Sequence, residues 1–392
     1  MERIKAVADR VKATVDEGHE VAVVLSAMAG TTNQLVEWTR QAGQLHDARE
    51  YDVVVASGEQ VTVGLMAIAL QNLGVDARSW LGWQLPVETD AVHGGARIER
   101  IETAVLDQRL KQGQVAVVAG FQGLGPDGRI ATLGRGGSDT SAVALAAALN
   151  ADRCDIYTDV DGVYTTDPRI VPRARKLDRI TFEEMLEMAS GGAKVLQTRS
   201  VAMAMRHGVK LQVLSSFEDL PGTLVSEEDE TMEKNLVSGI AYSLDEAKIT
   251  LAGVRDKPGV AATVFSRLAE HHVNVDMIVQ SAASAPGETD ITFSVPSPSM
   301  AQVVSLLEEM KESLECRNIL AADHVSKVSV VGVAMRSQPG IASTMFATLA
   351  EKGINIEVIS TSEIKISVLI AEDYTELAVR SLHTAFGLDA PA

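Results

Sequence analysis

A glycine-rich segment in the middle of the chain carries residue types that suit an amino-acid ligand. It covers 132–149 and reads TLGRGGSDTSAVALAAAL. The glycines let the backbone approach an anion closely, and the helix expected after Asp139 directs its positive N-terminal end at the same place. Arg135 can grip a carboxylate with two N–H groups, while Asp139 suits an ammonium. The alternative is a plain glycine-rich turn with Asp139 as a helix N-cap.

Two shorter segments could add polar groups to the same site. LSAMAGTTN at 25–33 follows an expected strand and supplies Ser26 and Thr32 among small residues. SGEQ at 57–60 places Glu59 ahead of a very apolar helix. Taken by itself, Glu59 is explained as a negative charge at a helix N-terminus, which the helix dipole favours. The hydroxyl-bearing loop is typical of a segment that a polar ligand approaches.

A third group of residues indicates phosphate chemistry. YTDVDGVYTTDPR at 157–169 is an expected strand end followed by a glycine turn, and it carries Asp159, Tyr164 and Arg169. Open α/β sheets bind ligands beyond the carboxyl ends of their strands, which favours a nucleotide site over a simple loop of turn-forming residues. GGAKVL adds Lys194 near a helix start, where an ammonium serves as a point charge for phosphate.

These segments need a sheet to position them. EVAVVLSA (20–27), QVAVVAGF (114–121) and RCDIYTDV (153–160) are typical of short buried strands. The Ala- and Leu-rich runs at 61–74 and 141–151 suit the crossover helices that parallel strands require. The pattern predicts an α/β domain with a mostly parallel sheet covered by helices on both faces.

The C-terminal part contains an internal repeat. KPGVAATVFSRLAEHHVNVDMI and QPGIASTMFATLAEKGINIEVI align without a gap, so that Pro258 matches Pro339 and Asp276 matches Glu357. Each copy has the order strand, Pro-Gly turn, amphipathic helix, strand, strand and helix, which implies the ferredoxin-like βαββαβ unit. The acidic stretch SEEDETMEKN at 226–235 precedes the first copy and is typical of a solvated linker.

The composition excludes several classes of protein. A formal net charge of −18 argues against a nucleic-acid surface, which relies on clustered Lys and Arg. The two cysteines, Cys154 and Cys316, support neither a disulfide framework nor a structural zinc site. The N-terminus lacks the apolar run of a signal peptide, and we expect no stretch of the roughly 20 apolar residues that span a bilayer. We therefore expect a soluble, cytoplasmic protein without membrane or nucleic-acid partners.

Together these segments resemble the aspartokinase family. The similarity runs in family order through VVLSAMAGTTN, SGEQV, VVAGFQG, ATLGRGGSDT, YTDVDGVYTTDPRIVP, the GAK segment and the two repeats, which resemble amino-acid-binding ACT domains. It is nearest to the lysine- and threonine-responsive bacterial type. It implies an α/β fold with an amino-acid-kinase-type sheet between helices at 1–225, a linker at 226–245, and two ferredoxin-like ACT domains at 246–322 and 323–392.

The resemblance also implies a reaction and its ligands. MgATP would phosphorylate the β-carboxylate of L-aspartate to give 4-phospho-L-aspartate, the first step towards lysine, threonine and methionine. ATP and Mg²⁺ are the implied cofactors, and lysine, threonine or both are the implied feedback effectors. The implied catalytic residues are Arg135, Asp139 and Lys194. The implied aspartate-binding residues are Ser26, Thr32, Glu59, Arg135, Ser138 and Asp139. The implied ATP-binding residues are Thr158, Asp159, Tyr164, Arg169 and Lys194.

The ACT resemblance implies two effector pockets. The free N–H groups at the start of the first helix suit a carboxylate, and a neighbouring Asp or Asn suits the ammonium. The alternative is a pair of ferredoxin-like modules that only dimerise. The implied effector-binding residues are Asp256, Gly259, Val260, Asn274, Asp276 and Gln280 in the first copy, and Ile341, Ala342, Asn355, Ile356, Ser362 and Glu363 in the second.

The sequence departs from the family at its start. Members open with a strand and a Lys-Phe/Tyr-Gly-Gly-Thr/Ser-Ser segment that contacts the transferred phosphate, whereas this sequence begins at MERIKAVADRV, similar to the helix that follows. The departure favours an alternative in which the chain is a catalytically impaired, effector-binding regulatory subunit. Another kinase, for glutamate or uridylate, is a second alternative, against which the ACT pair and SGEQ argue. Because exposed sheet edges tend to pair, we expect a homo- or hetero-oligomer formed through the ACT domains.

Overall fold

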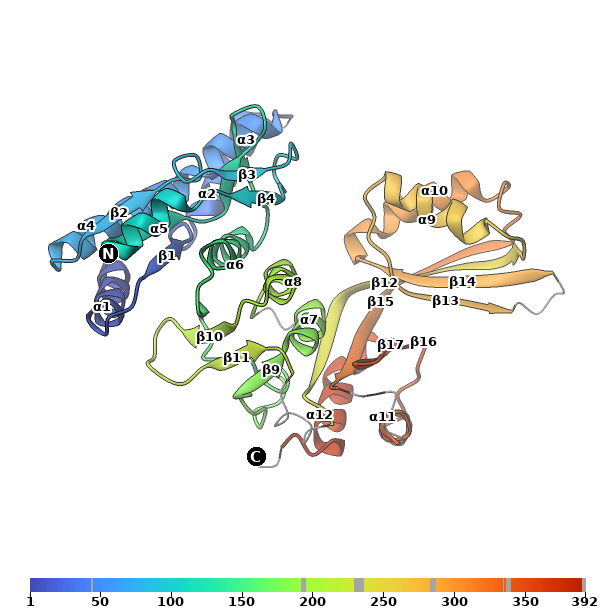
Figure 1. Cartoon of the computed structure of the whole chain (residues 1–392). Coiled ribbons are helices and arrows are strands. Elements are labelled where there is room, and N and C mark those ends of the chain that lie inside the picture. The colour runs from blue at the N-terminus through green and yellow to red at the C-terminus, as the bar shows by residue number, and fades with distance from the viewer. Residues whose placement is uncertain are drawn as a thin grey trace. The chain divides into compact units, whose positions relative to one another are not determined.

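The computed structural model describes residues 1–43, 45–191, 195–228, 236–282, 287–333, 335 and 340–389. The chain divides into two compact units, which are coloured by position in the chain in Figure 1. Unit 1 consists of Met1–Asp161 and Leu196–Glu227, and unit 2 consists of Gly162–Val195 and Glu228–Ala392. The boundary expected near residue 225 therefore leaves out one segment that precedes it in the sequence but belongs to unit 2. Residues 162–191, expected within the kinase domain, pack with the C-terminal part of the chain.

Unit 1 is an α/β unit, as predicted. Its strands form the parallel sheet β1-β5-β2, the sheet β4-β3-β6-β7, and a group in which β8 runs parallel to β10 and β10 antiparallel to β11. The strands predicted from the sequence correspond to β1, β5 and β8. The elements of unit 1 are α1 (Glu2–Asp16), β1 (Ala22–Leu25), α2 (Thr31–Ala42), α3 (Ala48–Val55), α4 (Ser57–Asn72), β2 (Ala77–Trp80), β3 (Val87–Thr89), β4 (Ile98–Ile101), α5 (Ala104–Lys111), β5 (Val115–Ala119), β6 (Gln122–Leu124), β7 (Ile130–Thr132), α6 (Gly137–Leu149), β8 (Cys154–Thr158), α8 (Thr198–His207), β10 (Leu211–Ser215) and β11 (Thr223–Ser226).

The central strand β5 is covered by helices on both faces, which confirms the prediction from its unbroken apolar run. Val115, Val117 and Ala119 belong to one core with residues of α1 and α4. Ala116 and Val118 belong to a second core with residues of α5 and α6. Successive side chains of a strand point to opposite faces, so every residue of β5 must be apolar to serve both cores.

The helix pair α3 and α4 corrects one expectation. The stretch Ala48–Asn72 is long and apolar enough to cross a membrane by length and composition, with a mean hydropathy of 1.7 in its most apolar window. Half of that window is buried inside the protein, where Met66 and Leu70 of α4 join the core against β5. The stretch also contains two buried acidic residues, Asp52 and Glu59. The arrangement is that of helices with one face in the core, while Val53, Val61 and Ile68 remain exposed on the other.

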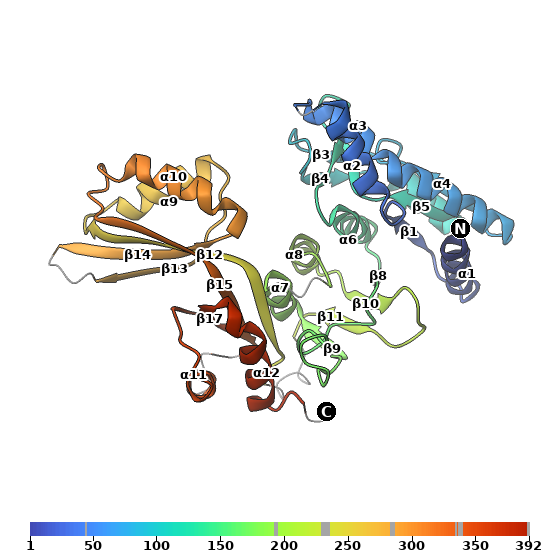
Figure 2. The same cartoon turned by 180° about the vertical axis from the view of Figure 1, so that it is seen from behind.

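Unit 2 contains both copies of the repeat, and their predicted helices and strands are confirmed. Figure 1 and Figure 2 both show α9 and α10 side by side on one face of the sheet. Pro339 of the second Pro-Gly pair lies outside the described residues. The elements of unit 2 are β9 (Arg179–Thr181), α7 (Phe182–Ser190), β12 (Gly239–Arg255), α9 (Val260–Glu270), β13 (Asp276–Ala282), β14 (Glu288–Val295), η2 (Ser297–Ser299), α10 (Met300–Met310), β15 (Asn318–Val331), α11 (Ile341–Glu351), β16 (Val358–Thr361), β17 (Lys365–Ala371), η3 (Glu372–Tyr374) and α12 (Thr375–Ala385).

The two copies share one six-stranded sheet with the order β13-β14-β12-β15-β17-β16. The second half of β12 pairs with β14 of the first copy, whereas residues 239–243 at its start pair with 327–331 of β15. One expectation is therefore wrong, because residues 239–245 of the predicted linker are strand. The strand beside β15 in the second copy comes from before the first copy. This pairing satisfies an edge of β15 that would otherwise expose unpaired backbone groups.

Each copy has its own hydrophobic core beneath its helices. Phe293 and Val264 are fully buried in the first core, and Met345 and Val368 in the second. A smaller cluster links strands β13 and β16, which lie at opposite ends of the strand order, through Met277 packed against side chains of the second copy. The two copies therefore form one continuous body through both their shared strands and this cluster.

Candidate active site

The carboxyl ends of β1 and β5 form one side of the candidate site in unit 1. The strands run parallel with Leu25 opposite Ala119, so Ser26 and Gly120 follow neighbouring strand ends. The N–H of Gly120 donates to the Leu25 carbonyl at 3.0 Å. A Cβ on Gly120 would lie only 2.9 Å from the Ser138 side chain, so the start of α6 packs closely on this edge. Ser26 and Ser138, predicted from separate motifs, are thus brought to the same edge of the sheet.

Glu59 lies in the first turn of α4 and is only 2% exposed. Its Oε1 accepts a hydrogen bond from the Ala27 N–H at 3.0 Å, while Oε2 is buried and has no hydrogen-bond partner among the described residues. Burial raises the pKa of this carboxyl group. A carboxylate oxygen that is held away from water without a donor is strongly stabilised by a bound cation such as an ammonium. The reading of Glu59 as a mere helix-end charge does not account for this burial.

Close packing also sets the start of α2 beside Glu59. A Cβ on Gly58 would lie 2.7 Å from the Cβ of Ala27 and 3.4 Å from Cγ2 of Thr31. Only glycine lets the two segments approach so closely. Thr32 follows in the first turn of α2 and is partly exposed. The hydroxyl-bearing loop and the buried carboxylate therefore belong to one neighbourhood, as the motifs suggested.

Asp139 lies in the first turn of α6, whose N-cap is Gly136 rather than Asp139, so the N-cap alternative is wrong. Burial raises the pKa of Asp139 to about 6, against an opposing hydrogen bond from the Gln197 backbone. A Cβ on Gly136 would lie 2.0 Å from Cγ of Gln197, and its φ of 70° is left-handed, so the position requires glycine. Arg135, by contrast, is exposed, with its guanidinium available to a solvent-borne anion.

Sequence reasoning missed a set of residues behind the glycine-rich loop, which we define as residues 134–139. Asp52 is fully buried and hydrogen-bonded to His93, and Arg199 donates at 2.7 Å to the carbonyls of both Leu133 and Ala96. Burial lowers the pKa of Arg199. The signal for Asp52 was present: one carboxylate inside the apolar run YDVVVA is costly to bury unless it is hydrogen-bonded.

The residues predicted to hold ATP are divided between the two units. Thr158 and Asp159 end β8 in unit 1, where the Thr158 hydroxyl donates to the Asp159 carboxylate at 3.0 Å. Tyr164 and Arg169 lie in unit 2. The Arg169 side chain is 88% exposed, with its guanidinium 2.7 Å from the Asp167 carboxylate.

Lys194, assigned to both catalysis and ATP binding, lies outside the described residues.

The segment that carries Tyr164 and Arg169 is anchored by α12 within unit 2. The Thr165 hydroxyl and Nε2 of the buried His383 are 2.9 Å apart, and Nδ1 of His383 lies 2.5 Å from the Asp389 carboxylate. Arg380 donates to the carbonyl of Ile170 at 2.9 Å. Residues predicted to bind nucleotide are therefore fixed by the last helix of the second ACT copy.

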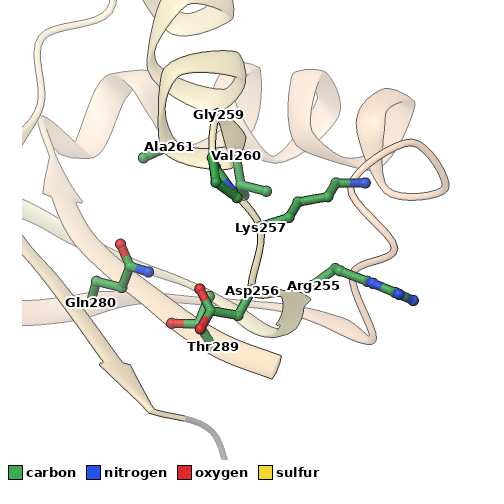
Figure 3. A pocket seen from close by; sticks show the side chains of 9 residues that line it. Arg255, Asp256, Lys257, Gly259, Val260, Ala261, Gln280 and Thr289 are labelled. Atoms are coloured by element: carbon green, nitrogen blue, oxygen red, sulfur yellow. The ribbon is translucent and has the colours of Figure 1, made fainter. Parts of the chain in front are cut away.

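A cavity of about 460 Å³ opens at the start of α9 in the first ACT copy. Figure 3 shows the carboxylate of Asp256 beside Thr289 on the side that carries Gln280, whereas Arg255 and Lys257 extend away. Arg255 and Lys257 instead pair with Glu315, their cationic groups lying 3.2 Å and 3.1 Å from its carboxylate. The residues lining the cavity are Arg255, Asp256, Lys257, Pro258, Gly259, Val260, Ala261, Gln280 and Thr289.

Four of the six predicted effector residues of this copy line the cavity, whereas Asn274 and Asp276 do not. The Asp276 carboxylate lies 2.8 Å from the ammonium of Lys327 and accepts a hydrogen bond from the Met277 N–H. Its charge is therefore already neutralised within the protein, which corrects its expected place among the cavity-lining residues.

The residues predicted for the second effector pocket take several structural roles. Ile341 is buried in the core of the second copy, and Ala342 and Ile356 pack against that core. Ser362 holds the turn between β16 and β17, because its Oγ accepts a hydrogen bond from the Lys365 N–H at 3.2 Å. The neighbouring Glu363 accepts one from the Met335 N–H through its carbonyl, and Asn355 is exposed.

Comparison with known proteins assigns the chain to a family. Residues 1–215 match the amino acid kinase family, and residues 249–310 and 328–386 match the ACT domain. An aspartate kinase from Pseudomonas putida is 53% identical over 393 residues, covering 100% of this chain and 95% of that protein. The chain belongs to the aspartate kinase family. The alternatives of a glutamate or uridylate kinase are thereby set aside.

Solved aspartate kinase structures support the same assignment. The crystal structure of Escherichia coli aspartokinase III in complex with aspartate and ADP, in the R-state, is 30% identical with a TM-score of 0.74, covering 90% of this chain and 79% of that one. The T-state structure of the same enzyme, in complex with lysine and aspartate, covers the same shares with a TM-score of 0.67. This aspartate kinase family member thus shares both its catalytic and its regulatory modules with relatives of known structure.

Proposed function

We propose that this protein transfers the γ-phosphoryl group of MgATP to the β-carboxylate of L-aspartate, giving 4-phospho-L-aspartate and ADP. The observation that carries the proposal is that the buried Glu59, the partly buried Asp139 and the exposed Arg135 belong to segments that meet at the carboxyl ends of β1 and β5. Glu59 leaves one buried oxygen without a donor, and burial raises the pKa of Asp139 to about 6. Both groups gain a partner when the substrate ammonium binds, while Arg135 matches a substrate carboxylate.

The reaction needs positioning more than a covalent catalyst. An oxygen of the substrate β-carboxylate attacks the γ-phosphorus, and the bond from that phosphorus to the β,γ-bridging oxygen breaks, so ADP leaves with the electron pair. The attacking group is already an anion and requires no general base. Glu59, Arg135 and Asp139 would hold aspartate so that this oxygen faces the nucleotide. Ser26, Thr32 and Ser138 would add hydroxyl contacts along the same edge.

Nucleotide binding is assigned to the residues around the end of β8 and in the following segment. Thr158 and Asp159 end a strand, where open α/β sheets bind ligands. Tyr164, Arg169 and Lys194 complete the assigned set, and Mg²⁺ arrives with the nucleotide. The positive charge of Lys194 would offset negative charge on the transferred phosphoryl group.

The first test is aspartate-dependent ADP release from MgATP. It is run on the 392-residue chain and on the same chain preceded by the Lys-Phe/Tyr-Gly-Gly-Thr/Ser-Ser segment that opens the family. Turnover by either version supports the proposal. If both versions are silent while lysine or threonine still binds, the protein is a regulatory subunit and the kinase assignment is overturned.

We assign lysine or threonine to the cavity at the start of α9. The effector carboxylate would meet the N–H groups of the first turn of α9, and Asp256 would meet the ammonium. The proposal includes assembly through the ACT domains and a cytoplasmic location, where amino-acid effectors are found.

Asp256→Asn is expected to weaken effector binding by about tenfold or more, because it removes one charge-assisted hydrogen bond to the ammonium. Titration calorimetry with lysine and with threonine measures the change, and activity without effector is expected to stay unchanged. Asp323→Asn, an exposed carboxylate outside the cavity, is the matched control. Equal affinities in the wild type and Asp256→Asn would contradict this placement of the effector.

A further inference from the structure

We propose that a buried cluster formed by Asp52, His93 and Thr132 positions the glycine-rich loop and thereby sets the affinity for aspartate. These three are positioning residues, because they act on the loop rather than on the substrate. The inference rests on the proposed function, since it takes the glycine-rich loop to be the part that binds aspartate.

Asp52 is the centre of the cluster and is fully buried on α3. One carboxylate oxygen accepts from Nδ1 of His93 at 2.7 Å, and the other accepts from the Thr132 hydroxyl at 2.5 Å. The N–H of Gly94 lies 3.1 Å and 3.2 Å from the two oxygens. Three donors from two distant parts of the sequence therefore meet on one carboxylate. Charge-assisted hydrogen bonds of this kind fix the position of the groups that donate them.

The cluster is connected directly to the base of the glycine-rich loop. Thr132 is the last residue of β7, and its carbonyl accepts a hydrogen bond from the Ala96 N–H at 2.9 Å. The Gly94 carbonyl lies 3.1 Å from where a Cβ on Gly134 would stand, so the segment 93–96 forms a wall behind the first glycine of the loop. Arg199 then bridges this wall and the loop base through its two carbonyl contacts. A displacement of Asp52 would therefore reach the loop through Thr132, which precedes it in the chain, and through Gly94, whose carbonyl lies against Gly134.

The same helix also leads to the second acidic group of the site. α3 ends at Val55 and α4, which carries Glu59, begins at Ser57. The intervening carbonyl of Ala56 accepts from the buried Gln122 side chain at 3.1 Å, which fixes this junction. Asp52 therefore lies between α4, which carries Glu59, and the segments that hold the glycine-rich loop. Apolar side chains can often replace a buried charged network without loss of stability, so the placement of this one beside the site favours a positioning role.

The test compares two nearly isosteric pairs. Thr132→Val removes only the hydroxyl that donates to Asp52, whereas Thr132→Ser keeps it. His93→Leu removes the Nδ1 donor, whereas His93→Asn keeps an amide nitrogen at about the same place. We expect Thr132→Val and His93→Leu to raise KM for aspartate about tenfold, with KM for MgATP unchanged, and the two conservative variants to restore it. Hydrogen exchange of the loop amides is expected to rise in the same two variants, with α1 amides as the internal reference.

The outcomes are distinct from those of the proposed function. Absence of aspartate turnover both in the unmodified protein and in the version with the added N-terminal segment overturns the proposed function. Turnover with wild-type aspartate KM in both Thr132→Val and His93→Leu overturns this inference alone. Equal increases in KM for aspartate and MgATP also overturn it, because they indicate general loosening of the fold. If Thr132→Val does not fold, the comparison of His93→Leu with His93→Asn decides the question, because the His93 side chain is 10% exposed and lies at the rim of the cluster.

Discussion

Asp139→Asn is expected to lower kcat/KM for aspartate strongly and, at the same time, to stabilise the folded protein above pH 6. Burial raises the pKa of the Asp139 carboxyl group from 3.8 to about 6. Above pH 6 the folded protein therefore carries a desolvated negative charge that the substrate ammonium would compensate. Asparagine keeps the shape of the side chain but cannot offer that charge. We expect kcat/KM for aspartate to fall by about 10²- to 10³-fold.

The sign of the stability change follows from proton linkage. The folded state keeps its proton up to about pH 6, whereas an unfolded aspartate loses it near 3.8. Folding therefore takes up a proton between these values, and stability falls as pH rises through this window, by up to roughly 3 kcal/mol. Asparagine has no such loss, so Asp139→Asn should gain stability over the wild type at pH 8 and gain little at pH 4.

Thermal unfolding at pH 4, 6 and 8 measures the stability effect, and kcat/KM measures the catalytic one. Asp152→Asn, at an exposed position shortly after α6, is the control, and no change is expected in either quantity. In the wild type, KM for aspartate is expected to rise as pH falls through about 6, because protonated Asp139 no longer attracts an ammonium. A destabilised Asp139→Asn protein at pH 8 would contradict the assignment of Asp139 as a strained, substrate-directed carboxylate.

The sequence predicted well those elements whose pattern is local. The unbroken apolar run of β5 indicated a strand buried on both faces, and the residues 115–119 indeed divide between two cores. The repeat indicated the helices and strands of both ACT copies, because each copy repeats the same turn and the same amphipathic spacing. The motifs also singled out Ser26, Glu59 and Asp139 as residues of one candidate site, and their assignment as ligand contacts stays a prediction.

What the sequence could not predict depends on contacts between distant segments. A repeat defines the local structure of its copies but does not say which segment completes each sheet, so the role of residues 239–243 was missed. The anchoring of 162–191 in unit 2 depends on contacts such as Thr165 with His383, which no motif predicts. The apolar run around Asp52 signalled a buried carboxylate, but its donors could not be predicted for the same reason, since they lie about 40 and 80 positions away in the chain.

Asp276 and Glu357, which the repeat aligns, make matching contacts. The ACT resemblance placed Asp276 among the effector-binding residues, whereas both acids form ion pairs with lysines. Asp276 pairs with Lys327, and Glu357 pairs with Lys248. Lys248 lies where β12 pairs with β14 of the first copy, and Lys327 lies where β15 pairs with β17 of the second. Each acid therefore meets a lysine of the opposite copy, which joins the two copies reciprocally.

Lys327→Met is expected to destabilise unit 2 by about 3–5 kcal/mol, as is typical when one partner of a buried ionic network is removed. The Lys327 side chain is 9% exposed, and its ammonium lies 2.7 Å from the Glu246 carboxylate and 2.8 Å from that of Asp276. Burial acts to lower the pKa of Lys327, but the two carboxylates outweigh it and the pKa is raised. Methionine has a similar volume, so the expected loss comes from the charge and not from a cavity.

Removing the lysine leaves the 8%-exposed Glu246 without its cation, and this gives the prediction a specific signature. The loss should shrink as pH is lowered from 7 to 5, because protons can then neutralise the abandoned carboxylates. It should also be largely reversed in the double variant Glu246→Gln with Lys327→Met, whereas exposed Lys352→Met should have no effect. Hydrogen exchange of β12 and β15 amides reports on unit 2 separately from unit 1. If neither the lower pH nor the Glu246→Gln substitution reduces the loss of stability, Lys327 contributes through packing alone. The reciprocal ion pairs then do not hold the two copies together.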